Sequence, residues 1–355
     1  MKPNRISKYA VIQALWVVFL VFALLGGAPQ VFGADEIVVC TWGGDFSKTE
    51  KIAFFDPFEK ETGIKIKIVS FPEYAKMKAM VMTQNLEWDV VTAELKWVLR
   101  GAKEGLFEPL DFNVIDTKDF LPDTVHPSGF GVMSEAYTHA ICYNTNKFSE
   151  QNHPRTWKEF FDVNKFPGPR SLYNSPMSNL EIALVSDGVP PDKLYPLDVD
   201  RAFRYLDKIK PNIQVWYKSL AQTAQLVATQ EVHLICAGPP RMFFIRKEGA
   251  PVNVEFNQAI ADKSFWVVLK GSKQKANAMK LINSMTRPKP QADWVNMYPF
   301  GVANKKAYDY IKPEMLPWIP TSPVNLPKLV WLSSEWWAEN EAKMYERWNE
   351  WMVKK

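Results

Sequence analysis

The 355-residue sequence contains few of the side chains on which metal centres and disulfide-bonded folds depend. It has three cysteines and four histidines, and neither a CxxC nor an HxxxH spacing occurs. A structural zinc site, which needs closely spaced Cys and His ligands, is therefore not expected. Cys40, Cys142 and Cys236 cannot all pair, and each lies in or beside an apolar run. We interpret them as buried thiols that pack as small apolar side chains.

The sequence also lacks the motifs of common hydrolases. A GxSxG turn, which would present a serine nucleophile, is absent. The four histidines are scattered along the chain and none is paired with a serine at the end of a predicted strand: His126, His139, His153 and His233. We therefore predict a protein that is not an enzyme and that carries neither a metal nor a cofactor.

An excess of one charge is missing as well. The chain has 43 Lys and Arg against 39 Asp and Glu, and three of the basic residues lie among the first eight positions. A strongly basic face, which binding to nucleic acid requires, is not indicated. We expect no nucleic-acid partner.

The first 34 residues predict a secretory signal peptide. Three basic residues precede an almost wholly apolar run from Tyr9 to Leu25, and the small-residue stretch VFGA follows at 31–34. We place the cleavage after Gly33 or Ala34. The apolar run is shorter than the roughly 20 residues of a membrane-spanning helix, so a retained anchor is the weaker alternative.

The remaining residues predict two α/β lobes. They exceed what one hydrophobic core usually holds. Predicted strands at 36–42, 64–69 and 88–91 alternate with predicted helices, which indicates a parallel sheet with helices on its faces. Long apolar strands at 136–148 and 264–272 are expected to cross between the lobes. The predicted lobes are 35–141 plus 266–308 and 142–265 plus 309–355.

Two short motifs fall where ligands of open α/β sheets bind, beyond the carboxyl ends of strands. TWGGDF follows the first strand at 41–46, and TAE follows the third at 92–94. Gly43 and Gly44 would let a ligand approach the backbone because they have no Cβ. Trp42 would form a wall of the site, and the Glu94 carboxylate would bind an ammonium group.

Several longer motifs, in this order and spacing, give the chain a family likeness. They are FDPFEKETGIKI, WDVVTAELKWVLRGAKEGLFEPLD, AICYNTNKF, FPGPR, LEIALVSDGVPPDKLYPLDVDRAFRYLDKIKP and EWWAENEAKMYERWNEW. The chain resembles the periplasmic substrate-binding proteins of bacterial ABC importers, in the branch that includes spermidine/putrescine-binding proteins. The resemblance implies a two-lobed periplasmic-binding-protein fold (type II-like) with a ligand cleft between the lobes. It also implies a periplasmic location, a small-molecule solute, closure around that solute and delivery to an ABC permease at the inner membrane. We expect a monomer.

The resemblance further implies that Trp42, Glu94, Trp266 and Tyr298 line the cleft. It is incomplete, because Val268 stands where polyamine binders have an aspartate that anchors an ammonium. Cation–π contacts contribute roughly 0.5–2 kcal/mol each, whereas a micromolar ligand requires about 8 kcal/mol, so a charged partner is needed.

Arg241 follows a rigid Pro-Pro pair at a strand end and is a candidate for binding a carboxylate in two parallel hydrogen bonds. With Glu94 it would select a zwitterionic solute, an amino acid or ω-amino acid, rather than a polyamine. Ser219 is a candidate for an additional hydrogen bond.

Each candidate also has a structural reading: the three aromatics as core residues, Glu94 as a surface acid, and Arg241 as part of a structural ion pair. A receptor for a neutral solute such as a sugar and a periplasmic transferase on the same fold remain alternatives.

Overall fold

The computed structural model describes residues 35–354, so the predicted signal peptide lies outside the described residues. Residues Glu36–Lys355 form one unit that is built on a nine-stranded sheet. The strands are β1 (Glu36–Thr41), β2 (Lys65–Ser70), β3 (Val90–Glu94), β4 (Gly131–Asn144), β5 (Arg170–Tyr173), β6 (Ile213–Tyr217), β7 (Leu234–Ala237), β8 (Val252–Val268) and β9 (Val330–Trp331). Their order is β2-β1-β3-β8-β4-β7-β5-β6, and β9 pairs with β8.

Helices follow most of the strands. The α-helices are α2 (Gly44–Glu50), α3 (Asp56–Thr62), α4 (Tyr74–Thr83), α5 (Leu95–Lys103), α6 (Trp157–Phe160), α7 (Asn179–Ser186), α8 (Val199–Ile209), α9 (Leu220–Ala228), α10 (Pro239–Lys247), α11 (Lys275–Met285), α12 (Pro288–Val295) and α13 (Ser334–Val353). A π-helix at Lys51–Phe55 joins α2 to α3. Five short 3₁₀ turns lie at Pro191–Lys193, Lys210–Asn212, Lys305–Asp309, Pro313–Trp318 and Leu326–Lys328.

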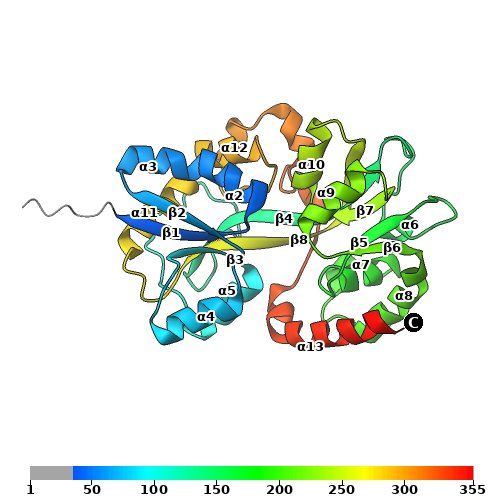
Figure 1. Ribbon diagram of the computed structural model, residues 1–355, viewed down its shortest axis with the longest axis horizontal. Helices are drawn as coiled ribbons and strands as arrows, with labels where there is room; N and C mark the ends of the chain where they lie inside the picture. The colour runs from blue at the N-terminus through cyan, green and yellow to red at the C-terminus, as the bar shows by residue number, and fades with distance from the viewer. Residues whose placement is uncertain (1–34, 355) are drawn as a thin grey trace, which may run out of the picture. The chain divides into compact units, whose positions relative to one another are not determined.

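The β1–β3 side of the sheet confirms the predicted strand–helix alternation. β1 pairs in parallel with both β2 and β3. Figure 1 shows α2 and α3 on one face of these strands and α4 and α5 on the other. Apolar residues that alternate along the strands, such as Val39 and Val91, are fully buried between the layers. Gly63 ends α3 in the left-handed conformation, as its position after the predicted helix indicates.

Two long antiparallel strands connect the two sides of the sheet. β4 and β8 pair over most of their length, and β8 also pairs antiparallel with β3 (Figure 1). Both strands start earlier than predicted: β4 begins at Gly131, and β8 begins at Val252. The division into two lobes at the boundaries given above stays a prediction.

The β5–β7 side carries the second major core. β5 pairs in parallel with β6 and β7. The C-terminal helix α13 packs three buried indoles into this core, those of Trp337, Trp348 and Trp351. The helical spacing of these tryptophans predicts such packing. Sequence reasoning missed β5 and β6 because both are short and lie next to turn-forming residues.

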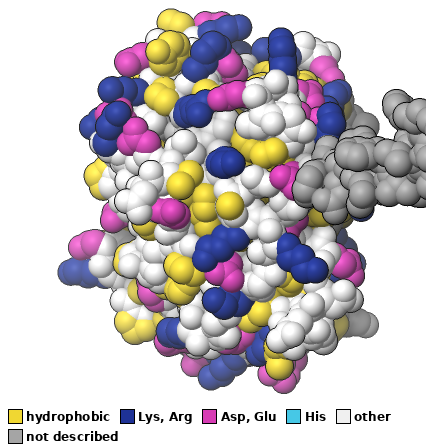
Figure 2. Space-filling view, turned by 90° about the vertical axis from the view of Figure 1, so that its left-hand side faces the viewer, with side chains coloured by type: hydrophobic (Ala, Val, Ile, Leu, Met, Phe, Trp, Pro, Cys, Tyr) yellow, Lys and Arg dark blue, Asp and Glu magenta, His cyan; other side chains and the backbone are white. Residues whose placement is uncertain are grey.

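Buried and exposed groups are distributed as in an ordinary globular unit. Cys40, Cys142 and Cys236 are free and buried, as predicted. Figure 2 shows acidic and basic side chains interspersed on the face that it presents. Among residues 35–354, no helix combines the length and apolar character that crossing a membrane requires.

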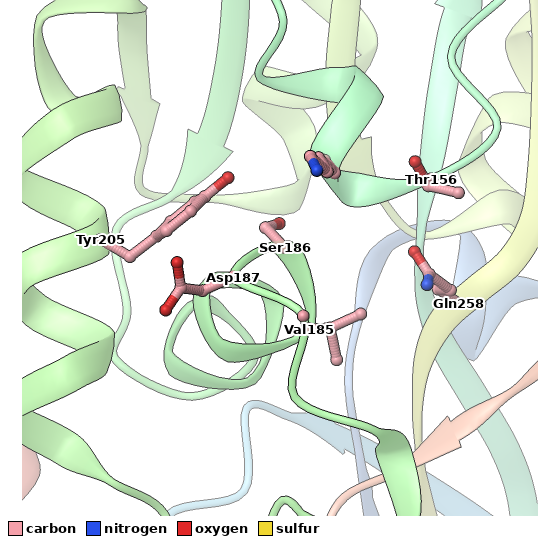
Figure 3. Close-up of a pocket in the computed structure, with 8 residues that line it drawn as sticks. Thr156, Val185, Ser186, Asp187, Tyr205 and Gln258 are labelled. Atoms are coloured by element: carbon pink, nitrogen blue, oxygen red, sulfur yellow. The ribbon is translucent and has the colours of Figure 1, made fainter.

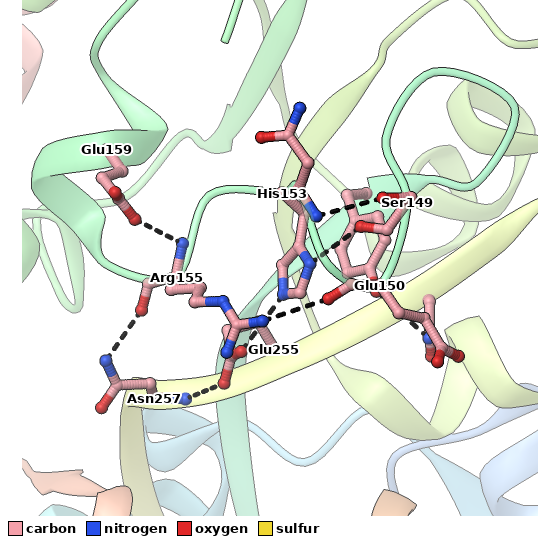
Figure 4. A network of polar contacts seen from close by, with 10 residues as sticks. Ser149, Glu150, His153, Arg155, Glu159, Glu255 and Asn257 are labelled. Carbon is pink, nitrogen blue, oxygen red and sulfur yellow. Dashed lines mark hydrogen bonds and ion pairs between the residues drawn. The ribbon is translucent and has the colours of Figure 1, made fainter. Parts of the chain in front are cut away.

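A polar network fixes the 149–159 loop to β8 (Figure 4). The His153 ring stacks on Tyr143 with centroids 4.3 Å apart, and its Nε2 lies 3.2 Å from Glu255 Oε2. Burial favours the neutral form of Glu255, but hydrogen bonds from His153 and from the Asn257 amide outweigh it and lower the pKa of this carboxyl. The network therefore holds β8 next to its irregular segment, where the pairing with β4 shifts register.

Candidate ligand site

Three neighbouring strands place two carboxylates and a hydroxyl side by side. Ser264 on β8 is the register partner of Glu94, the last residue of β3, and also of Glu135 on β4. Directly paired residues project from the same face of a sheet. Glu94, Ser264 and Glu135 thus form one row across the sheet at the carboxyl end of β3. This is the edge at which the sequence predicts a ligand.

A β-bulge positions the second carboxylate. The register between β4 and β8 shifts between Met133 and Glu135, which leaves Ser134 unpaired. Such bulges redirect the side chains that follow them. After the bulge, alternation along β4 places Glu135, Tyr137 and His139 on one face.

The buried carboxyl of Glu135 lacks the hydrogen bonds that would offset its removal from water. It is 1% exposed, and Oε2 has no hydrogen bond of standard geometry within the described part of the chain. Burial raises the pKa of Glu135 to about 7, and the nearby Glu94 adds to this. The nearby polar groups of Ser134, Ser264 and Trp42 act in the opposite direction without restoring the normal pKa. A ligand cation would stabilise the ionised form.

Asp262 extends the acidic row along β8. Its Oδ1 accepts a hydrogen bond from Ser334 Oγ at 2.9 Å, and Tyr137 Oη lies 3.4 Å from Oδ2. Burial raises the pKa of Asp262 to about 7, with a further contribution from Glu94. Burial also lowers the pKa of His139 to about 4, so this ring is neutral near pH 7; its Nδ1 lies 2.8 Å from Ser178 Oγ. The row is therefore acidic.

Glu94 has a cationic partner from its own chain. Lys96 on α5 forms ion pairs with Glu94 and with Glu341 of α13, the latter at 3.0 Å. The Lys96 side chain is only 4% exposed. The role of Glu94 in binding a solute ammonium stays a prediction. In the structure, the Lys96 ammonium already neutralises the Glu94 carboxylate.

Arg241 lies just beyond the end of β7, on the β5–β7 side of the sheet. It lies in the first turn of α10, and its Nη1 is 3.7 Å from Asp45 Oδ2 in α2. The guanidinium also contacts the Tyr298 hydroxyl; burial raises the pKa of that phenol, and Arg241 acts in the opposite direction. Nε is buried and has no hydrogen-bond partner among residues 35–354. Arg241 and Tyr298 therefore lie together, as a shared cleft requires.

Trp42 and the two glycines lie at the end of β1. Trp42 is partly buried, packs against Trp97 with centroids 6.0 Å apart, and directs its indole toward Glu135. The Gly43 amide donates to Ser47 Oγ at 2.8 Å, which closes the start of α2. Gly43 thus serves the protein's own backbone, whereas Gly44 is exposed with open space around its Cα.

We expect Gly43→Ala to destabilise the protein by roughly 1–3 kcal/mol. Gly43 has φ +81°, and an added Cβ would lie 3.1 Å from Ser70 and 3.2 Å from the Phe71 ring. Gly44→Ala is the matched control, since Gly44 has φ +58° but no neighbour within 4 Å of the added atom. Urea unfolding measures both. Equal losses would show that crowding against Ser70 and Phe71 contributes nothing.

Two predicted site residues lie outside this row. Trp266 is on the same face of β8 but two residues deeper, where it is 2% exposed within the hydrophobic core. Ser219 is exposed and caps α9, accepting from the Gln222 amide. Their binding roles stay predictions. Ser219 lies in the short connection between β6 and α9.

Sequence reasoning missed Glu135, Asp262 and Lys96. The strand predicted at 136–148 begins one residue after Glu135, and the strand predicted at 264–272 begins two residues after Asp262. Lys96 stands in a helix pattern where a lysine usually faces solvent. The sequence offered one indication of a site, an acid just before an apolar strand. That indication can be interpreted only when the pairing between the strands is known.

The acidic row is buried at Glu135 and Asp262 but partly exposed at Glu94, whose side chain is 18% exposed. A cavity of about 330 Å³ lies elsewhere, lined by residues of the α6–α8 corner and β8 that include Ser186, Asp187, Tyr205 and Gln258 (Figure 3). Within the described residues, no group of three or more His, Cys, Asp or Glu is arranged to hold a metal ion.

The family is decided by comparison with known proteins. The profile of the bacterial extracellular solute-binding proteins matches residues 53–321. The chain belongs to this family. The resemblance on which the sequence analysis relied is therefore confirmed, together with the fold class.

Three of the relatives of this solute-binding protein match it over at least 90% of its length. A γ-aminobutyric acid-binding protein of Pseudomonas aeruginosa is 32% identical over 340 residues, which are 94% of this chain and 95% of the relative. An ABC transporter substrate-binding protein from Bradyrhizobium japonicum is 37% identical, with a TM-score of 0.84 over 90% of this chain and 99% of that one. The structure of a GABA receptor is 34% identical, with a TM-score of 0.82 over 90% and 98%. Spermidine/putrescine-binding periplasmic proteins match at 22–25% identity. This solute-binding protein is a substrate-binding component of an ABC transporter.

Proposed function

We propose that this solute-binding protein captures a small ω-amino acid, with γ-aminobutyrate as the leading candidate, in the periplasm. It would hand the solute to an ABC permease without changing it chemically. The proposal rests on two groups of opposite charge with unused hydrogen-bonding atoms: the buried Glu135 carboxyl, whose Oε2 has no partner, and the partly buried Arg241 guanidinium, whose Nε has no partner among the described residues. Two solved or curated relatives are named for γ-aminobutyrate binding, which supports the same class of solute.

The two ends of the solute would meet different sides of the sheet. Its ammonium would lie between the Glu135 carboxylate and the Trp42 ring, where cation–π attraction adds to the charge pair. Its carboxylate would accept from the Arg241 fork, beside Tyr298. Since Trp42 follows β1 and Arg241 follows β7, a bound zwitterion connects the two sides. Such contacts favour the closed state over the open state, which is hinge closure.

Calorimetric titration of the purified protein tests this proposal. γ-Aminobutyrate is expected to bind with micromolar or lower Kd, which corresponds to about 8 kcal/mol. Butyrate and n-butylammonium each lack one charged end and should bind at least tenfold more weakly. Tighter binding of putrescine or of a sugar than of γ-aminobutyrate would overturn the proposal. Recovery of unchanged solute from the complex distinguishes a receptor from a transferase.

A further inference from the structure

Lys96 is an unusually buried charged residue outside the proposed solute contacts. It is the second residue of α5, and its side chain is 4% exposed. Lysine is almost never buried to this extent unless it is paired. Its ammonium contacts the Glu94 and Glu341 carboxylates, and it lies 3.4 Å from Met177 Sδ. The pocket around Nζ thus consists of two anions and a polarisable sulfur.

The three partners come from both sides of the sheet. Glu94 ends β3, on the β1–β3 side. Met177 lies just before Ser178, the N-cap residue of α7, and Glu341 lies on α13; both helices contribute to the core of the β5–β7 side. The tryptophans of α13 fix that helix to this core, so Glu341 does not move independently of it. Lys96 consequently joins the two sides through its side-chain nitrogen.

The charges around Lys96 favour its ionised form. Burial alone would lower the pKa of Lys96, but the Glu94 and Glu341 carboxylates outweigh it and raise the pKa. The same two carboxylates would otherwise be an unneutralised anionic pair at the junction of the two sides. The Lys96 ammonium therefore neutralises both carboxylates where the two sides meet.

We propose that Lys96 is a built-in ammonium that occupies a second amine-binding position, formed by Glu94 and Glu341, and so excludes diamines. A polyamine needs separate anionic positions for its ammonium groups. With one position filled by the protein, a solute with a single ammonium is accepted and putrescine is disfavoured. The exclusion of diamines rests on the proposed function. The existence of an amine-binding position between Glu94 and Glu341 does not depend on it.

Lys96→Ala with alkylammonium rescue tests the position. The substitution removes a propylammonium-sized group, and n-propylammonium at millimolar concentration is expected to raise the melting temperature of the variant. Lys103→Ala, an exposed lysine on the same helix, is the control and should not respond. Lys96→Met fills the space without charge and should also not respond. Equal responses of Lys96→Ala and Lys103→Ala would overturn the proposal.

Putrescine affinity tests the specificity. Lys96→Ala is expected to bind putrescine at least tenfold more tightly than the wild type, and adding Glu341→Gln should abolish both this gain and the amine rescue. Unchanged putrescine binding would contradict the exclusion of diamines.

If Lys96→Ala does not fold, Glu341→Gln alone remains informative. It should lower the melting temperature more than Glu339→Gln, an exposed acid on the same helix. An equal change would overturn the proposal. If the wild type does not bind γ-aminobutyrate but n-propylammonium still stabilises Lys96→Ala, only the proposed function is refuted.

Discussion

Replacing Arg241 by methionine is expected to weaken γ-aminobutyrate binding by roughly a hundredfold or more. Removing one partner of a buried, hydrogen-bonded charge pair costs about 2–5 kcal/mol, and each 1.4 kcal/mol is tenfold in Kd. The guanidinium is held at the start of α10 beside Tyr298, and its buried Nε has no hydrogen-bond partner among the described residues. The solute carboxylate would lose its only cationic partner in the proposed pose.

Three comparisons separate carboxylate recognition from a general loss of structure. Arg241→Lys keeps the charge but not the planar fork, so an intermediate affinity is expected. Arg246→Met, on the exposed face of the same helix, should leave the affinity unchanged. n-Butylammonium, which has no carboxylate, should bind the Arg241→Met variant as it binds the wild type. Retention of full γ-aminobutyrate affinity by Arg241→Met would exclude Arg241 from the site.

Glu135→Gln is expected to have the second large effect, a loss of affinity that depends on pH. In the free protein Glu135 has a pKa of about 7, so it is largely protonated at pH 5.5. An ammonium ligand requires the carboxylate, and binding therefore releases a proton. Wild-type affinity should fall as the pH drops below 7, approaching tenfold per pH unit. Glu135→Gln should bind weakly throughout and lose this slope.

Glu135→Gln should lower the affinity for the solute but raise the stability of the solute-free protein at high pH. An acid whose pKa is raised by folding contributes stability at low pH and loses it as the pH rises through the folded-state value. Glu135→Gln is thus expected to melt above the wild type at pH 8 and close to it near pH 4.5, in the absence of solute. The exposed Glu73→Gln is the control.

Other groups near Glu135 also affect how the solute affinity depends on pH, and their contributions can be measured. They are Glu94, Glu50, Tyr137, Ser134, Ser264 and the Trp42 indole, and Asp262 lies near Tyr137 in the same row. Burial also raises the pKa of Asp262 to about 7. The Asp262→Asn variant therefore shows how much Asp262 contributes to the change of affinity with pH. Calorimetry in buffers of different ionisation enthalpy counts the released protons. A wild-type affinity that is flat between pH 5.5 and pH 8 would contradict the role of Glu135.

The sheet could be predicted from the sequence because its signals are local. Alternating apolar residues specify β1, β2 and β3, and glycines mark the ends of α3 and α5. The lengths of β4 and β8 could not be predicted from local pattern, since polar residues such as Glu135, Asp262 and Gln258 interrupt their apolar character. Those residues are tolerated in the strands because neighbouring strands and α13 cover them.

The candidate site could be predicted only in part, for a related reason. Trp42, Glu94 and Arg241 stand next to glycines, a strand end or prolines, which are features visible in one stretch of chain. The partnership of Glu94 with Lys96 and Glu341 joins positions that are more than 240 residues apart, and no local pattern contains it. Likewise, only the register at Ser264 shows that Glu94 and Glu135 are neighbours.

The position of β8 between β3 and β4 limits how this protein can be dissected. A fragment that ends before residue 252 leaves β3 without its inner neighbour, because Val90–Glu94 pairs with Ser264–Val268. A fragment confined to the β5–β7 side lacks the three indoles that α13 returns from the C-terminus. Neither side is contained in one uninterrupted stretch, so neither is expected to fold from a fragment that is cut between the crossing strands.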